Sequence, residues 1–175
     1  MLVFGGSQGA HAINIAMAAA LPLLEPVSGR LEVTHQTGEK DAPEMNAAYQ
    51  RVGIRATVTP FIQDMADAYQ RADLVICRAG ATTIAEVTAC GRPSILIPFP
   101  HAVDDHQRRN AEALLSKGAC FMLLERELSG EKLAAMISKL IDNRELLEKT
   151  GRLAFDMARL DAAGIIVDEM MKITN

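Results

Sequence analysis

The chain has 175 residues, a formal net charge of −4 at pH 7 and a hydrophobic content of 49%. With 23% charged residues and no continuous apolar run near the ~20 residues that span a bilayer, the composition excludes a disordered chain and an integral membrane protein. The lack of a basic surplus and the 4% aromatic content, without tryptophan, argue against nucleic-acid binding through phosphates or stacked bases.

Short apolar runs alternate with longer segments of helical periodicity. We expect strands at residues 2–4, 31–35, 56–58, 74–77, 94–97 and 120–123, and helices at 10–21, 43–52, 65–71, 82–90, 105–117, 131–141, 144–157 and 162–171. Because these strands are apolar without polar alternation, they favour a parallel sheet covered on both faces. We therefore predict one α/β domain with a doubly wound parallel sheet, which ends in a helical extension from about residue 143.

The cysteines and the first residues indicate the setting of this domain. Cys77, Cys90 and Cys120 are far apart in apolar segments, which predicts buried free thiols in a reducing compartment. The chain opens directly in a core strand, without the charged and apolar regions of a secretory signal. This start suggests a domain taken from a longer protein.

A glycine-rich segment, residues 5–10, connects the first strand to the first helix. Its glycines allow close approach of an anion, the helix N-terminus offers free N–H groups and Ser7 adds a hydroxyl, so the segment predicts phosphate binding. Three alternatives stay open. The segment contains the G-x-S-x-G of α/β-hydrolases, although His101 and His106 complete a triad only loosely. A dinucleotide-binding site would need an acidic residue at the end of the second strand, but residues 35–38 contain none. The third alternative is a glycine turn that only packs.

A second loop of small residues, 78–80, leads from the fourth strand into a helix. The hydroxyls of Thr82 and Thr83 lie where capping or phosphate contacts are made. Glu86 is four residues after Thr82, on the same helix face, where a carboxylate can accept two hydrogen bonds from the cis-diol of a ribose. The alternative is a local helix-start interaction between Thr82 and Glu86.

A third loop precedes the helix that contains Gln107 and Asn110. These two residues share a helix face, and their amides offer both donors and acceptors to sugar hydroxyls. One alternative is a solvated helix start. The other is a metal site made by His101, Asp104, Asp105 and His106, although these residues lack the i,i+4 histidine pair of helical metal sites.

The three loops together describe a nucleotide-sugar pocket. Over essentially its whole length the sequence resembles the C-terminal half of the MurG family of N-acetylglucosaminyltransferases. The resemblance is carried by residues 5–10, 35–38, 61–65, 78–86 and 98–110. It implies the Rossmann-like C-terminal domain of an inverting GT-B glycosyltransferase, which binds the donor UDP-N-acetylglucosamine (UDP-GlcNAc) without a metal or cofactor.

The resemblance also implies the donor contacts. They are Gly6, Ser7, Gln8 and Gly9 at the diphosphate, the backbone of Ile62 at the uracil, Ala81, Thr82, Thr83, Ile84, Ala85 and Glu86 at the phosphates and ribose, and Gln107 and Asn110 at the sugar. The family's N-terminal domain, with the acceptor site and a candidate base, lies outside these residues. The isolated chain would then not be catalytic.

The full-length enzyme of such a family converts lipid I to lipid II in peptidoglycan synthesis. It would lie at the cytoplasmic face of the bacterial inner membrane and serve cell wall biogenesis, cell shape and cell division. The alternative is a stand-alone nucleotide-sugar-binding subunit that needs a separate acceptor-binding chain.

Overall fold

The computed structural model describes residues 1–6 and 9–173 of the chain. Six strands form one parallel sheet in the order β3-β2-β1-β4-β5-β6. They are β1 (Leu2–Phe4), β2 (Glu32–Gln36), β3 (Arg55–Thr59), β4 (Val75–Cys77), β5 (Ser94–Leu96) and β6 (Phe121–Met122). The order runs outward from β1 to β3 and restarts on the other side of β1 with β4, so the predicted doubly wound parallel sheet is confirmed.

The predicted helices are all present, with ends that differ from the expected ones by a few residues. They are α1 (His11–Leu24), α2 (Ala42–Arg51), α3 (Met65–Gln70), α4 (Ala81–Ala89), α5 (His106–Leu115), α6 (Gly130–Ile141), α7 (Arg144–Phe155) and α8 (Ala162–Ile173). Three of them begin at a side-chain cap, in which Asp64, Ser129 and Asn143 accept hydrogen bonds from backbone N–H groups of α3, α6 and α7.

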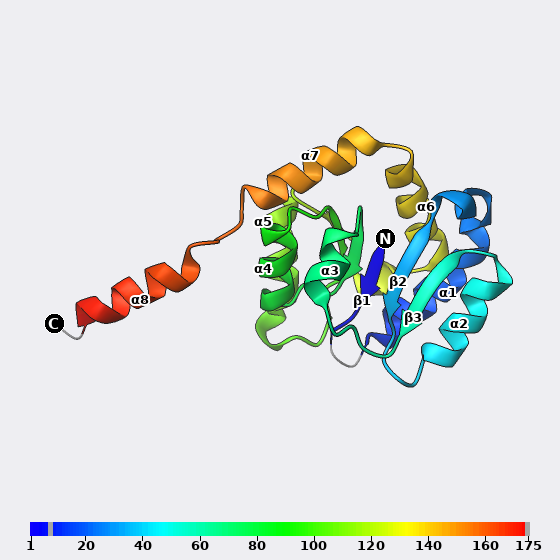
Figure 1. The fold of residues 1–175 in the computed structure, drawn as a ribbon, viewed down its shortest axis with the longest axis horizontal. Helices are drawn as coiled ribbons and strands as arrows, with labels where there is room; N and C mark the ends of the chain where they lie inside the picture. The colour runs from blue at the N-terminus through cyan, green and yellow to red at the C-terminus, as the bar shows by residue number, and fades with distance from the viewer. Residues whose placement is uncertain (7–8, 174–175) are drawn as a thin grey trace.

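The sheet separates two apolar layers because successive side chains of a strand point to opposite faces. Val3 of β1 packs into the layer that contains residues of α1, α2 and α6. Leu2 and Phe4 pack into the opposite layer, with residues of α3, α4, α5 and α7. The helices therefore cover both faces of the sheet, as the continuous apolar strands predict (Figure 1).

The helical stretch His11–Arg30 is long and apolar enough to cross a membrane by length and composition alone, with 20 residues and a mean hydropathy of 1.3. Continuous apolar runs did not reveal it, because polar residues such as Asn14 interrupt the stretch. In the fold, α1 buries Ile13, Met17 and Leu21 in the layer it shares with α6. The α1 part of the stretch is therefore a core helix of this domain, and Glu25–Arg30 follows it as a 3₁₀ helix without buried residues.

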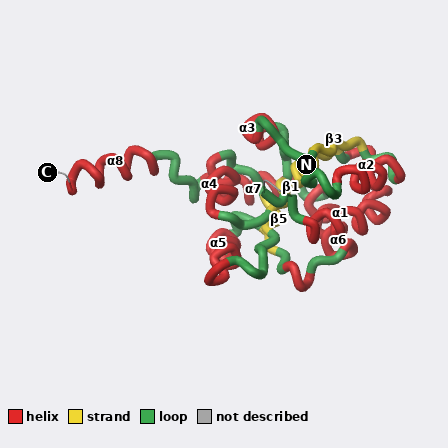
Figure 2. The backbone as a smooth tube through the Cα atoms, turned by 90° about the horizontal axis from the view of Figure 1, so that it is seen from below, coloured by secondary structure: helices red, strands yellow, loops and turns green. Residues whose placement is uncertain are grey.

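The last two helices differ in their contacts. α7 crosses the sheet at the amino ends of its strands and packs on α4 (Figure 1). Gly151 of α7 approaches the backbone so closely that a β-carbon would lie 2.5 Å from the carbonyl oxygen of Gly91. α8 extends away from the rest of the fold, and its side chains are exposed (Figure 2).

The three cysteines are free thiols. Cys77 and Cys120 are buried, and burial raises the pKa of both thiols, that of Cys120 to about 12. Cys90, the residue that follows α4, is only half-buried. The expectation of a buried thiol was wrong for this residue.

Candidate functional site

The three loops singled out in the sequence lie at one edge of the sheet. They follow β1, β4 and β5, which are neighbours, and the carboxyl ends of parallel strands meet at the same edge. The strand order changes direction between β1 and β4, so the chain leaves these two strands toward opposite faces, the topology at which open α/β sheets bind their ligands. Ser7 and Gln8 of the predicted site lie outside the described residues.

The glycine loop takes a conformation that other residues rarely adopt. Gly6 and Gly9 have φ angles of +99° and +75°, and the N–H of Gly9 donates to the Gly6 carbonyl at 2.9 Å. A β-carbon at Gly9 would collide with the carbonyl oxygen of Thr37, so glycine lets the loop rest against the end of β2. Ala10, the N-cap of α1, makes no side-chain cap hydrogen bond, and the N–H groups at such a helix N-terminus are suited to an anion.

Gln36, at the end of β2, joins the glycine loop to the predicted uracil-binding residue. Its Nε2 donates to the carbonyl oxygen of Gly6 at 2.6 Å, and its Oε1 accepts from the N–H of Ile62 at 3.4 Å. Gln36 and Ile62 are both buried, and the amide bridges the two segments. Sequence reasoning gave Gln36 no role. The available signal was an amide side chain at the carboxyl end of a buried strand.

A buried polar network lies behind the glycine loop. The ring of His35 is hydrogen-bonded to the hydroxyl of Tyr49 and to Oδ1 of Asn14, each at 3.0 Å. Asn14 donates to Asp41 at 2.7 Å, and Asp41 also bonds to Nδ1 of His11 at 2.8 Å. Burial lowers the pKa of His35 to about 4, against a smaller opposing effect of the Asp41 charge. The network therefore holds a neutral His35 and ties α1 to the end of β2 and the start of α2.

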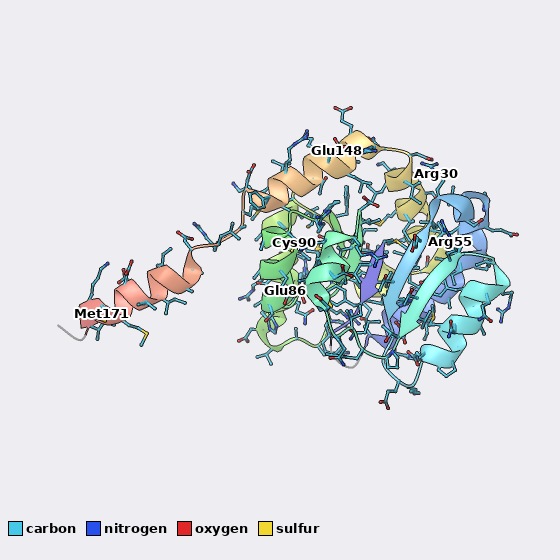
Figure 3. All side chains as sticks on the ribbon, viewed as in Figure 1. Arg30, Arg55, Glu86, Cys90, Glu148 and Met171 are labelled. Carbon is cyan, nitrogen blue, oxygen red and sulfur yellow. The ribbon has the colours of Figure 1, made fainter. Side chains whose placement is uncertain are left out.

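Glu86 lies on α4, whose first two turns contain the predicted donor contacts from Ala81 onward. The N-cap of this helix, Gly80, also lacks a side-chain acceptor. Figure 3 shows Glu86 nearer than Cys90 to the loop end of α4. Its Oε2 accepts a 3.0 Å hydrogen bond from the hydroxyl of Tyr69 on α3. In the described part of the chain, the carboxylate is thus held by Tyr69 and not by the local Thr82 contact that was the alternative.

Gln107 and Asn110 share a face of α5, as predicted, and both contact the loop after β4. The Oε1 of Gln107 accepts from the N–H groups of Ala79 and Phe99, at 3.2 and 3.1 Å. Asn110 donates to the carbonyl oxygen of Ala79 at 3.0 Å. Because backbone N–H groups fix the orientation of the Gln107 amide, its Nε2 is the atom left to donate to a ligand.

Arg78 is a further structural element of the site that sequence reasoning did not assign. Its guanidinium donates to the carbonyl oxygens of Ile97 and Pro98, at 3.2 and 3.3 Å. It also forms a 2.5 Å ion pair with Glu125 and lies 5.3 Å from the ring centre of Phe99. Arg78 thereby fixes the loop after β5 against the loop after β4.

The structure does not bring the candidate ligands of the metal alternative together. Within residues 1–6 and 9–173, no group of three His, Cys, Asp or Glu side chains could hold a metal ion. His106 instead bonds through Nδ1 to the carbonyl oxygen of Val103 at 2.8 Å. The candidate ligands at positions 101, 104, 105 and 106 are exposed and do not converge.

A cavity of about 990 Å³ lies at the opposite, amino edge of the sheet. It is lined by the starts of β1 and β4 and by residues of α7, among them Arg144 and Phe155. None of the predicted donor-binding residues that the structure describes lines this cavity. It is therefore separate from the candidate site.

Comparisons with known proteins identify relatives of the whole chain. The family described as glycosyltransferase family 28 C-terminal domain matches residues 1–163. A protein of Pelobacter propionicus named UDP-N-acetylglucosamine–N-acetylmuramyl-(pentapeptide) pyrophosphoryl-undecaprenol N-acetylglucosamine transferase is 67% identical over 175 residues, which are 100% of this chain and 46% of that protein. The protein of the same name from Geobacter sulfurreducens is 60% identical over 174 residues, or 99% of this chain and 48% of that protein.

The fold is also that of a solved relative. The crystal structure of Acinetobacter baumannii MurG matches with a TM-score of 0.88 and 37% identity, over 98% of this chain and 49% of that chain. The chain thus spans about half the length of the relatives it matches.

Proposed function

Because this chain belongs to glycosyltransferase family 28, as its C-terminal domain, we propose that it is the donor-binding half of an N-acetylglucosaminyltransferase and binds UDP-GlcNAc. The observation that carries the proposal is the convergence of the loops after β1, β4 and β5 at the switch point of the sheet. Gln36 ties the first of these loops to the turn at Ile62, and Gln107 ties the other two together. The relatives are about twice as long as this chain, and their names, which begin with UDP-N-acetylglucosamine, support the choice of donor.

The diphosphate would lie on the glycine loop, Gly6 to Gly9, in front of the N-terminus of α1. The resemblance assigns Ser7 and Gln8, which lie outside the described residues, to the same contact. The first turn of α4, with Thr82 and Thr83, would contact the phosphates from the opposite side. Two helix N-termini without side-chain caps would thus face the same anion, and their partial positive charges would stabilise it.

The nucleoside and the sugar would lie on either side of the diphosphate. The backbone of Ile62 would meet the uracil edge, where the 3.4 Å bond from its N–H to Gln36 is long enough to exchange for a base oxygen. Glu86 would accept hydrogen bonds from the ribose hydroxyls. Gln107 would donate from Nε2 to a hydroxyl of N-acetylglucosamine, while Asn110 would keep the Ala79 peptide in place.

This half would stabilise the leaving group in the transfer reaction. As the acceptor hydroxyl attacks the anomeric carbon, the bond to UDP breaks and negative charge grows on the diphosphate. Preoriented N–H groups and helix N-termini are worth most where charge develops in this way, and they make a metal unnecessary. The acceptor site and the general base would come from the other half of the enzyme.

In the full-length enzyme, the reaction would convert lipid I to lipid II in peptidoglycan synthesis, and so serve cell wall biogenesis, cell shape and division. We place that enzyme in the cytoplasm, peripheral to the inner membrane where the lipid-linked acceptor lies. Residues 1–175 would act as one donor-binding unit, with residues 143–175 as its helical extension.

Calorimetric titration of the chain tests this proposal. We expect UDP-GlcNAc and UDP to bind, and GDP-linked or CDP-linked ligands to bind far more weakly. Glu86→Ala should weaken UDP binding by about 1–3 kcal/mol, because the two ribose hydroxyls lose the carboxylate that accepts their hydrogen bonds. Glu112→Ala, which removes an exposed carboxylate on α5, is the matched control and should leave the affinity unchanged. No binding of UDP at millimolar concentration would overturn the assignment.

A further inference from the structure

Tyr69 is a buried residue, and the only polar atom of its side chain contacts Glu86 of the candidate site. Tyr69 lies in the last turn of α3 and is 2% exposed. Its ring packs edge-on against Phe4 of β1, with centroids 6.0 Å apart and an interplanar angle of 82°. Its hydroxyl emerges from this apolar packing at Glu86, where it donates to Oε2 at 3.0 Å.

The chemistry of this contact is that of a fixed donor to a carboxylate. Burial raises the pKa of Tyr69 well above its ordinary value, and the nearby Cys77 and Glu86 act in the same direction. The phenol therefore keeps its proton and donates it in a hydrogen bond to Oε2 of Glu86. A carboxylate offers about four lone-pair positions, so the second oxygen and the remaining position of the first stay available to a diol.

Tyr69 also connects the ribose side of the site to the base side. Ile62, at the predicted uracil contact, lies just before α3, which begins after its side-chain cap Asp64. Tyr69 lies in the last turn of the same helix. Ile62 and Tyr69 belong to the same buried apolar cluster, together with Phe4. A displacement of α3 would thus move the base-binding turn and the partner of Glu86 together.

From this geometry we propose that Tyr69 is the positioning residue that orients Glu86 toward the ribose cis-diol, so that the site selects ribonucleotide over deoxyribonucleotide donors. The inference rests on the proposed function, because it assigns the partner of the ribose-binding carboxylate. A glutamate has three side-chain torsions, and freezing them upon binding lowers the affinity. Tyr69 freezes them in advance, and its hydroxyl does so without touching the ligand.

The test compares Tyr69→Phe with the unchanged chain, using UDP and 2′,3′-dideoxy-UDP as the two ligands. Phenylalanine keeps the packing on Phe4 and removes only the donor. We expect UDP binding to weaken about 3- to 10-fold, as for the loss of one hydrogen bond, while binding of 2′,3′-dideoxy-UDP changes less than about twofold. In a Glu86→Ala background, which leaves the Tyr69 hydroxyl no carboxylate to orient, Tyr69→Phe should have little further effect on UDP binding.

Tyr49→Phe is the matched control. Tyr49 is equally buried and its hydroxyl is hydrogen-bonded to His35, away from Glu86. This variant should lose stability in thermal unfolding but should keep the ratio of UDP to 2′,3′-dideoxy-UDP affinity.

Two outcomes would overturn the role of Tyr69 alone. In the first, Tyr69→Phe binds UDP as tightly as the unchanged chain does. In the second, it loses affinity for both ligands equally, which would indicate a purely structural residue. If the unchanged chain binds neither ligand, the proposed function itself fails, and the role of Tyr69 falls with it.

Discussion

The side-chain amide of Gln36 donates a 2.6 Å hydrogen bond to the carbonyl oxygen of Gly6, so the end of β2 fixes the loop that follows β1. The same amide accepts from Ile62, which places one buried side chain between the predicted diphosphate and uracil contacts. The two halves of the nucleotide site are therefore not independent, and a change at Gln36 disturbs both.

We expect Gln36→Ala to weaken UDP binding about 10-fold and to lower the free energy of unfolding by about 1–3 kcal/mol, because buried backbone groups lose their partner. Titration calorimetry and urea unfolding measure the two effects. Gln50→Ala, an exposed position at the end of α2, should change neither. An unchanged UDP affinity in Gln36→Ala would show that the bridge does not shape the site.

A comparison of Gly9 with Gly53 distinguishes the cost of backbone strain from the cost of a steric collision. Gly9 has a φ of +75°, and a β-carbon there would meet the carbonyl oxygen of Thr37, whereas Gly53 has a φ of +68° with nothing within 4 Å of its β-carbon position. Gly53→Ala should lower the free energy of unfolding by about 1 kcal/mol from strain alone. Gly9→Ala should lower it by about 3 kcal/mol or more and weaken UDP binding, since the loop must move. Equal losses in urea unfolding would contradict the collision.

The sheet and the positions of the helices could be predicted because they depend on local patterns. The apolar triplet Leu2–Phe4 and the glycine loop after it indicate a buried strand that leads into a helix, wherever the rest of the chain lies. The site loops follow from the same reasoning, because the carboxyl ends of parallel strands share an edge.

The partners of the site residues could not be predicted, because they come from distant parts of the chain. Glu86 had a plausible local partner in Thr82, but it bonds to Tyr69, which is 17 residues earlier and is brought there by packing against Phe4. Gln36 and Gly6 are 30 residues apart and meet only because β1 and β2 are neighbours. Spacing along a sequence contains no information on such contacts until the strand order is known.

Gln107 offers a test of the sugar contact that leaves the loop contacts intact. Gln107→Glu keeps an oxygen for the N–H groups of Ala79 and Phe99 but removes the amide donor. Its charge would repel both ligands, so the ratio of their affinities is the informative quantity. We expect UDP-GlcNAc binding to weaken about 5- to 10-fold more than UDP binding, since only the former can lose a hydrogen bond to Nε2. An unchanged ratio in parallel titrations would remove Gln107 from the sugar site.

The buried His35 predicts how stability depends on pH. Its folded-state pKa is lowered from 6.5 to about 4, chiefly by burial, so between these values the unfolded chain binds more protons than the folded one. The stabilisation is complete above pH 6.5 and decreases as the pH falls toward 4, by up to about 3 kcal/mol for this group. Tyr49 and Asn14 bond to the ring, and Asp41 is the charged group that opposes the shift.

Urea unfolding between pH 7 and pH 4 measures this dependence. We expect the unfolding free energy of His35→Gln to fall less steeply as the pH decreases, with a slope that is smaller by the equivalent of up to one bound proton. This difference in slope does not depend on the stability of the variant at pH 7. His101→Gln, at an exposed histidine, should leave the slope as it is. If His35→Gln and the unchanged chain lose stability in parallel over this range, then His35 is not the group whose protonation destabilises the fold, and the neutral network behind the glycine loop must be reassigned.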